Sequence, residues 1–206
     1  MFSIGEAIAQ GWRIFKENTG LLVGVHIAAL LIQVVPQMLF TDSPGLFALT
    51  VIVSMLLSFV VALGLVRIGL NLVDGKPASF GDLFACSHLV FKYLIASLLH
   101  GFLILVGLML LIAPGLIWGA QFSQWPFLMV EHDLGPIEAL KQSSRITRGT
   151  RGKLILLFAS IIGLVIAGLL ALVVGILVAY PVITVASAFV YREILASQPR
   201  TDEVAA

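Results

Sequence analysis

The sequence is short of charge and of cysteine. Only 11% of its 206 residues are charged, and 60% are hydrophobic. An ordinary soluble domain has about 25% charged residues. A chain of this length cannot hide so much apolar surface in one core, so the composition excludes a water-soluble protein and predicts a multi-spanning membrane protein. The single cysteine, Cys86, excludes an internal disulfide and a cysteine-based metal cluster.

Patterns typical of catalytic sites are also absent. The sequence has no Ser/His/Asp set, no His-Glu-x-x-His pair, no phosphate-cradling glycine loop and no carboxylate-rich metal constellation. No predicted span contains an Asp or Glu that would bind a coupling cation at mid-membrane. We therefore expect no enzyme activity, no cofactor and no bound metal. The first twenty residues include two acids and two cations and do not read as a cleaved signal peptide.

Long apolar stretches dominate what is present. They run over residues 21–40, 46–73, 93–113, 116–130 and 154–191. A span needs about 20 residues, whereas the last stretch would be about 57 Å long as one helix. It must therefore fold back on itself, with a turn between Val173 and Pro181. The sequence thus predicts an all-α integral membrane protein with six transmembrane helices.

The distribution of lysine and arginine supports this count. All twelve fall on one side of the six-span arrangement, and the three opposite turns, at Asp42, Pro114 and Pro181, contain none. Positive residues concentrate on the cytoplasmic side of membrane proteins. We therefore expect six spans with both termini in the cytoplasm.

An internal repeat predicts how the spans are organised. The pattern E-A-I-x-Q-x-x-R at residues 6–13 recurs as E-A-L-x-Q-x-x-R at residues 138–145, and a fainter copy begins at Ser79. We predict one membrane domain over residues 1–198, followed by a polar tail over 199–206. The domain would contain three quasi-repeats, at about 1–75, 76–132 and 133–198, each an amphipathic cytoplasmic helix followed by a helical hairpin.

The three predicted cytoplasmic helices differ in charge. The first places Ile8 and Trp12 on its apolar face, and the second covers Phe80 to Lys92 with Ser79 as its N-cap. The third begins at Pro136 and carries the basic stripe, which continues into the next span. This stripe is the predicted lipid- or anion-binding site, at about 1 kcal/mol per basic residue near an anionic surface. It comprises Lys141, Arg145, Arg148, Arg151 and Lys153. The same residues would also serve to fix topology or to bind a partner protein.

Several motifs resemble a known group. A-P-G-L-I opens a span at residues 113–117, P-F-L-M-V-E closes it at 126–131, and E-A-L-K-Q-S-S-R-I-T-R-G follows at 138–149. With the closing Y-R-E at 191–193, they resemble a broad group of uncharacterised bacterial inner-membrane proteins. The group includes six-span proteins of unknown function and the membrane domain fused to some glycerophosphodiester phosphodiesterases. The resemblance is specific from about Ala113 to Gly152 and implies the six-span fold. It implies no phosphodiesterase activity, because the sequence contains no soluble catalytic domain.

Polar residues inside the spans are candidates for a cavity. They are Arg67, Asn71, His26, His100 and Gln121. The two histidines lie at similar depth on different helices, which suits haem ligation, proton transfer or simple interhelical hydrogen bonds. Arg67 would either extend to the interface or face the bundle and bind an anionic group.

Small residues recur every four positions along the last apolar stretch. The stripe comprises Ala159, Gly163, Ala167, Ala171, Gly175 and Ala179. Such a stripe lets helix backbones approach closely, either within one chain or between two copies in a homo-oligomer.

The leading hypothesis is a non-enzymatic multi-pass inner-membrane protein that interacts with lipid or organises the envelope. Its expected partners are anionic headgroups at the cytoplasmic face and a second copy of the chain, with no nucleic acid. A small-solute or lipid transporter with a polar cavity inside the bundle is the first alternative. An intramembrane enzyme is the second.

Overall fold

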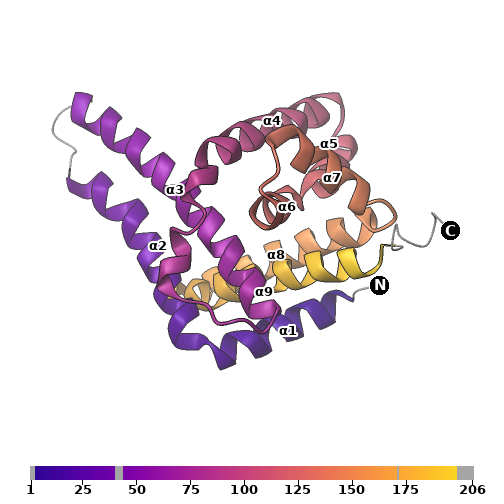
Figure 1. The fold of residues 1–206 in the computed structure, drawn as a ribbon, viewed down its shortest axis with the longest axis horizontal. Helices are drawn as coiled ribbons and strands as arrows, with labels where there is room; N and C mark the ends of the chain where they lie inside the picture. The colour runs from indigo at the N-terminus through magenta and orange to yellow at the C-terminus, as the bar shows by residue number, and fades with distance from the viewer. Residues whose placement is uncertain (1–2, 40–43, 171, 199–206) are drawn as a thin grey trace.

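The computed structural model describes residues 3–39, 44–170 and 172–198, and within these ranges it is entirely helical (Figure 1). The elements are α1 (Ile4–Glu17), α2 (Thr19–Leu39), α3 (Pro44–Val73), the short 3-10 helices η1 (Phe80–Leu83) and η2 (Ser87–Leu89), α4 (Val90–Leu110), α5 (Ile112–Phe122), α6 (Trp125–His132), α7 (Pro136–Ile146), α8 (Arg151–Leu170) and α9 (Leu172–Ala196). The predicted all-α class is confirmed for these ranges.

Four segments are long and apolar enough to cross a membrane. They are Thr19–Pro36, Gly45–Val73, Phe80–Leu110 and Leu177–Ala196. A fifth span results if α7 and the described part of α8, which meet at 105°, count as one. A helical membrane protein is therefore supported. Six spans and three repeated units remain predictions.

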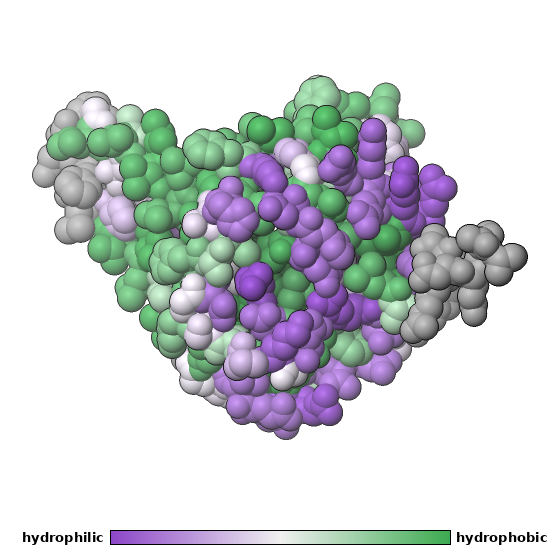
Figure 2. Space-filling model, in the orientation of Figure 1, coloured by the Kyte–Doolittle hydropathy of each residue, from purple (hydrophilic) through white to green (hydrophobic). Residues whose placement is uncertain are grey.

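The α2–α3 hairpin shows why a membrane is needed. Its outer part projects away from the other helices (Figure 1), and the face of this part seen in Figure 2 is mostly hydrophobic. Met38, Leu49 and Ile52 each expose more than half of their surface. An apolar area of this extent is covered by lipid or a partner in a stable protein. Hydrophilic side chains gather instead across the centre and right of the face in Figure 2.

The first predicted amphipathic helix is present as α1. Ser3 caps α1 by accepting a hydrogen bond from the Glu6 backbone N–H at 3.1 Å. The buried face of α1 includes Ala7 and Ile14 and lies along α9. Trp12 is 45% exposed. Its outward position suits an indole at the boundary between headgroups and acyl chains.

The second cytoplasmic helix, expected over Phe80 to Lys92, is not there. The chain makes two 3-10 turns, η1 and η2, before α4 begins at Val90. The carboxylate of Asp82 accepts a hydrogen bond from the Ser79 backbone N–H at 2.7 Å and holds η1 closed. Leu83 in η1 is buried against Gly64 of α3, so close that a Cβ at Gly64 would lie 2.3 Å from the Leu83 backbone. Packing of η1 against α3 and α2 thus takes the place of the regular helix that the apolar spacing predicted.

The predicted span over residues 116–130 is broken. Its residues divide between α5 and α6, and neither is long enough to cross a hydrocarbon core of about 30 Å. The helix stops at Ser123, whose Oγ donates a hydrogen bond to the Ala120 carbonyl at 2.9 Å. Pro126 has no N–H to continue the hydrogen-bond pattern and is tolerated only because it begins a new helix.

The turn expected between Val173 and Pro181 is also misplaced. Helix α9 is continuous from Leu172, with Pro181 inside it, so no turn lies between Val173 and Pro181. Helices α8 and α9 approach so closely that a Cβ at Gly168 would lie 3.0 Å from the Gly175 carbonyl oxygen. A proline inside a membrane helix is tolerated when neighbouring groups satisfy the freed backbone, which is why Pro181 did not mark the turn.

The contact between η1 and α3 generates a prediction. Gly64→Ala should lower the free energy of unfolding by about 1–3 kcal/mol, because the new methyl group overlaps the Leu83 backbone and overpacking costs this much. Thermal unfolding in detergent measures the loss. Gly101→Ala is the matched control, since nothing lies within 4 Å of a Cβ added there in α4. Equal stability of the two variants would contradict the close packing of η1.

Candidate functional site

A polar network joins the ends of three helices. Arg192 in α9 donates from Nε and Nη2 to the two carboxylate oxygens of Asp74, each at 2.7 Å. Its Nη1 donates to Glu131 at the end of α6. The Tyr191 hydroxyl donates to the other oxygen of Glu131 at 2.5 Å, and Lys76 pairs with Asp74 at 3.2 Å. One guanidinium thus bridges residues that are 118 and 61 positions away along the chain.

The network is partly shielded from water. The side chains of Asp74, Glu131 and Arg192 are 19%, 23% and 26% exposed, so their charges are less screened than those of a fully exposed pair. Burial acts to raise the pKa of the Asp74 carboxyl, but the hydrogen bonds and charges of Arg192 and Lys76 outweigh it and hold that pKa below its usual value. The arrangement therefore stabilises the ionised form of Asp74, and the resulting ion pairs hold the ends of α3, α6 and α9 together.

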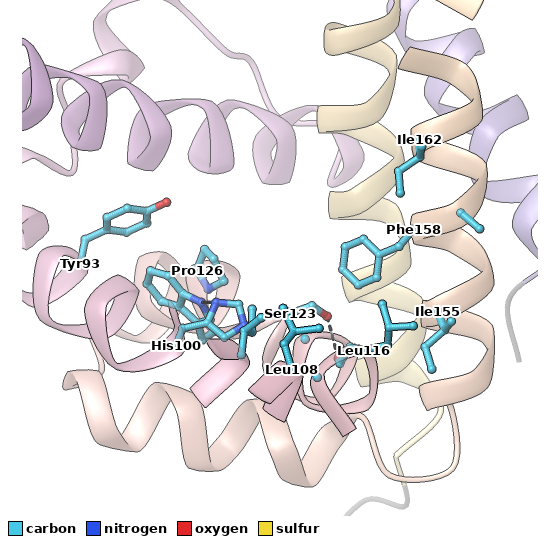
Figure 3. A pocket seen from close by; sticks show the side chains of 15 residues that line it. Tyr93, His100, Leu108, Leu116, Ser123, Pro126, Ile155, Phe158 and Ile162 are labelled. Carbon is cyan, nitrogen blue, oxygen red and sulfur yellow. Dashed lines mark hydrogen bonds between the residues drawn. The ribbon is translucent and has the colours of Figure 1, made fainter. Parts of the chain in front are cut away.

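An apolar pocket of about 650 Å³ lies on the other side of α6. Figure 3 shows Ile155 and Phe158 of α8 pointing toward Leu116 of α5 and toward Ser123. Helix α4 closes another wall with Tyr93 and His100. The full lining is Tyr93, His100, Ile104, Leu108, Gly115, Leu116, Gly119, Ala120, Ser123, Trp125, Pro126, Ile155, Phe158, Ala159 and Ile162. No residue with a permanent charge is among them.

His100 is the predicted cavity residue that lines this pocket. The Trp125 indole Nε1–H donates to His100 Nδ1 at 3.2 Å, so the proton of the neutral ring lies on Nε2. That nitrogen is buried and makes no hydrogen bond in the described part of the chain, although the backbone of Gly119 lies nearby. His100 therefore holds Trp125 in place at the pocket wall.

The structure does not bring the other predicted cavity residues together. His26 bonds the Leu22 carbonyl at 2.7 Å and the Thr184 hydroxyl at 3.3 Å, which ties α2 to α9. Gln121 donates to Ser144 of α7 at 2.6 Å. Arg67 is exposed on α3 beside Cys86, and Asn71 lies one turn further along. None of these four lines the pocket.

Helix α7 is docked onto the break between α5 and α6 by polar side chains. The hydroxyls of Ser143 and Thr147 both donate to the Gln121 carbonyl, at 3.1 and 2.9 Å. The Ser143 hydroxyl also accepts from the Gln124 backbone N–H at 3.1 Å. Both hydroxyl residues are fully buried. Sequence reasoning missed this contact, although two buried hydroxyl residues four positions apart on a basic helix were a signal for it.

The basic stripe lies on the outside of this docked segment. Lys141, Arg145 and Arg148 are exposed and form no ion pair within the described ranges. Arg151, at the start of α8, is half-buried, and its Nε is enclosed without a hydrogen-bond partner in the described structure. Lys153 follows on the same helix. The docking of α7 thus turns its charged face outward.

The small-residue stripe is divided between two helices. Gly175 and Ala179 of α9 pack against Gly168 of α8, so this part serves contact within the chain. Ala159 lines the pocket, and a Cβ at Gly163 would meet nothing within 4 Å. The side chain of Ala167 and the whole of Ala171 lie outside the described residues.

Breaking the polar network should destabilise the fold. We expect Arg192→Gln to lower the free energy of unfolding by about 1–3 kcal/mol, less than the 3–5 kcal/mol of a fully buried pair, because the carboxylates keep some contact with water. Thermal unfolding in detergent is the measurement. Lys92→Gln is the control, since it breaks the more exposed ion pair with Asp133 and should cost less. A larger loss in the control would contradict the role of Arg192.

The lowered pKa of Asp74 predicts a pH dependence. Its ionised form stabilises the fold, so this contribution is fully present above the ordinary value of 3.8 and is lost as the pH falls through the lower pKa of the folded state. Melting temperatures between pH 3 and 7, within the range that detergent micelles tolerate, measure it. Asp74→Asn should be less stable near neutral pH and should lose less stability on acidification. An unchanged acid slope in this variant would contradict the assignment.

Comparisons with known proteins place the chain among proteins without an assigned activity. The uncharacterized protein Mb2590 of Mycobacterium bovis and the uncharacterized protein Rv2560 of Mycobacterium tuberculosis are each 26% identical to it over 230 residues. Each alignment covers 96% of this chain and 70% of the relative. No solved structure matches the chain. A family described as "Protein of unknown function (DUF975)" matches residues 37–198, and the chain belongs to this family.

Proposed function

We propose that the protein is a non-enzymatic, multi-pass inner-membrane protein that binds anionic lipid headgroups where α7 leads into α8. We call this segment, which carries Lys141, Arg145, Arg148 and Arg151, the elbow. The observation behind this proposal is that Lys141 and Arg145 of α7, and Arg148 just after it, are exposed and form no ion pair in the described structure. Cations near a membrane surface attract anionic lipid by about 1 kcal/mol each.

The contrast with other charges supports this assignment. Asp74 and Glu131 are bound to Arg192, and Asp133 is bound to Lys92. Because these acids are paired with other cations, they do not neutralise the cations of α7. Glu138, on α7 itself, forms no ion pair within the described ranges, and its carboxylate lies near Gly135. Lys141, Arg145 and Arg148 therefore keep their positive charge available for an external anion, as far as the described residues show.

The proposal also includes the number of spans and their orientation in the membrane. Six spans with both termini in the cytoplasm would place α7 and the start of α8 at the inner surface, where anionic lipids are abundant. The suggested relation to the membrane domain of glycerophosphodiester phosphodiesterases belongs to the same proposal, as does an envelope-organising role. A homo-oligomer is compatible with it. A solute transporter finds less support, because only His100 of the five polar residues expected in a cavity lines the pocket.

Removing charge from the elbow tests the proposal. Arg145→Gln with Arg148→Gln should weaken binding to phosphatidylglycerol vesicles roughly 20- to 30-fold, the equivalent of about 2 kcal/mol for two cations. Adding Lys141→Gln should weaken it further. Co-purified lipid measured by mass spectrometry should lose its anionic fraction in parallel.

The matched control is the pair Arg13→Gln and Lys16→Gln. These are two exposed cations of α1, and they also lack an ion pair within the described ranges. The same loss in both double variants would indicate general electrostatic attraction without a site at the elbow. An unchanged lipid content in the α7 variants would refute the proposed function.

A further inference from the structure

One cation of the elbow, Arg151, lies on the same face of α8 as three residues of the apolar pocket. Ile155, Phe158 and Ile162 line the pocket. Arg151 precedes them by four, seven and eleven residues, a spacing that places all four side chains on the same side of a helix. At 1.5 Å per residue, the pocket residues lie about 6 to 16 Å along the axis from Arg151. A cation therefore stands at one end of an apolar chamber.

The pocket walls select for an apolar occupant. Most of its lining is apolar, and two of its four polar side chains, Trp125 and Ser123, already bond to neighbouring groups. Trp125 donates to His100, and the Ser123 hydroxyl donates to the Ala120 carbonyl and accepts from Gln124. A polar solute would thus find few partners to replace its hydrogen bonds to water, which is unfavourable. A hydrocarbon chain has no hydrogen bonds to lose when it enters the pocket.

The group at the end of the chamber selects for an anion. Arg151 is half-buried, and its Nε–H is enclosed without an acceptor in the described structure. A buried donor left unsatisfied costs about 1–3 kcal/mol, more when it is charged. A phosphate oxygen would supply the missing acceptor, and arginine is well suited to phosphate because its planar guanidinium offers paired donors.

We propose that the pocket holds one acyl chain of an anionic phospholipid whose phosphate is bound at Arg151. The volume of about 650 Å³ lies within the range of about 300–1,000 Å³ that is typical of ligand pockets. This inference rests on the proposed headgroup binding and adds a bound chain to it. The protein then takes up an individual lipid molecule, and Lys141, Arg145 and Arg148 select its headgroup.

Trp125 supplies a direct probe of the bound chain. In the variant Trp12→Phe with Trp118→Phe, Trp125 is the remaining tryptophan, because the sequence has three. The protein is reconstituted with phosphatidylglycerol that carries bromine atoms on its acyl chains, since bromine quenches indole fluorescence at contact. Strong quenching is expected from a chain in the pocket.

Two further substitutions separate the pocket from lipid around the protein. Ala159→Phe fills the pocket from α8, whereas Gly163→Phe adds the same ring one turn later, where a Cβ meets nothing within 4 Å. We expect quenching to fall in the first variant and to persist in the second. If Ala159→Phe fails to fold, Gly119→Leu fills the pocket from α5, where the nearest atom to an added Cβ lies at 3.9 Å. Equal quenching in filled and unfilled variants would overturn the proposal.

The role of Arg151 has its own readout. Arg151→Gln should reduce quenching by brominated phosphatidylglycerol more than quenching by brominated phosphatidylcholine, whose headgroup has no net charge. An equal effect on both lipids would refute a phosphate site at Arg151. Loss of headgroup selectivity in the α7 variants tests the proposed function separately. If that selectivity is lost while filling the pocket changes nothing, headgroup binding stands and the acyl-chain site falls.

Discussion

The guanidinium of Arg192, bound at once to Asp74 and Glu131, is the contact on which the arrangement of the helices depends. Helices in a membrane gain little by burying apolar surface against one another, because lipid is as apolar as their side chains. Polar contacts and close backbone approach must therefore fix their positions. The network does so where α3, α6 and α9 end, while the close contacts of Gly64 with Leu83 and of Gly168 with Gly175 lock the helices elsewhere.

A second polar contact places the candidate lipid site. The carbonyl of Gln121 accepts hydrogen bonds from Ser143 and Thr147, and this docks α7 where α5 gives way to α6. The chain must then turn by 105° to enter α8. That turn begins α8, whose Ile155, Phe158 and Ile162 line the pocket together with α4, α5 and α6. The broken span thus provides both the acceptor that holds α7 and the space that forms the pocket.

Long periodic patterns were predictable from the sequence, and local packing was not. The apolar runs gave the helical membrane class and the positions of α2, α3 and α4, and the spacing around Trp12 gave α1. The predictions of a helix over Phe80–Lys92 and of a turn between Val173 and Pro181 failed because contacts across the fold decided both. For the site, the spacing exposed the basic stripe. The pocket and the Arg192 network join residues too distant in sequence for spacing to reveal.

The two segments that resemble each other, 132 residues apart, differ in what they pack against. Helix α1 lies along α9 and uses small and apolar residues such as Ala7 for that contact. Helix α7 docks through buried hydroxyls instead, so its charged face remains outward. Where α7 and α8 carry Lys141 and Arg151, the first segment has Ala9 and Thr19. The additional cations thus occur at the copy that leads into α8, whose Ile155 and Phe158 line the pocket of about 650 Å³, as expected if they hold an anionic headgroup above a chain bound there.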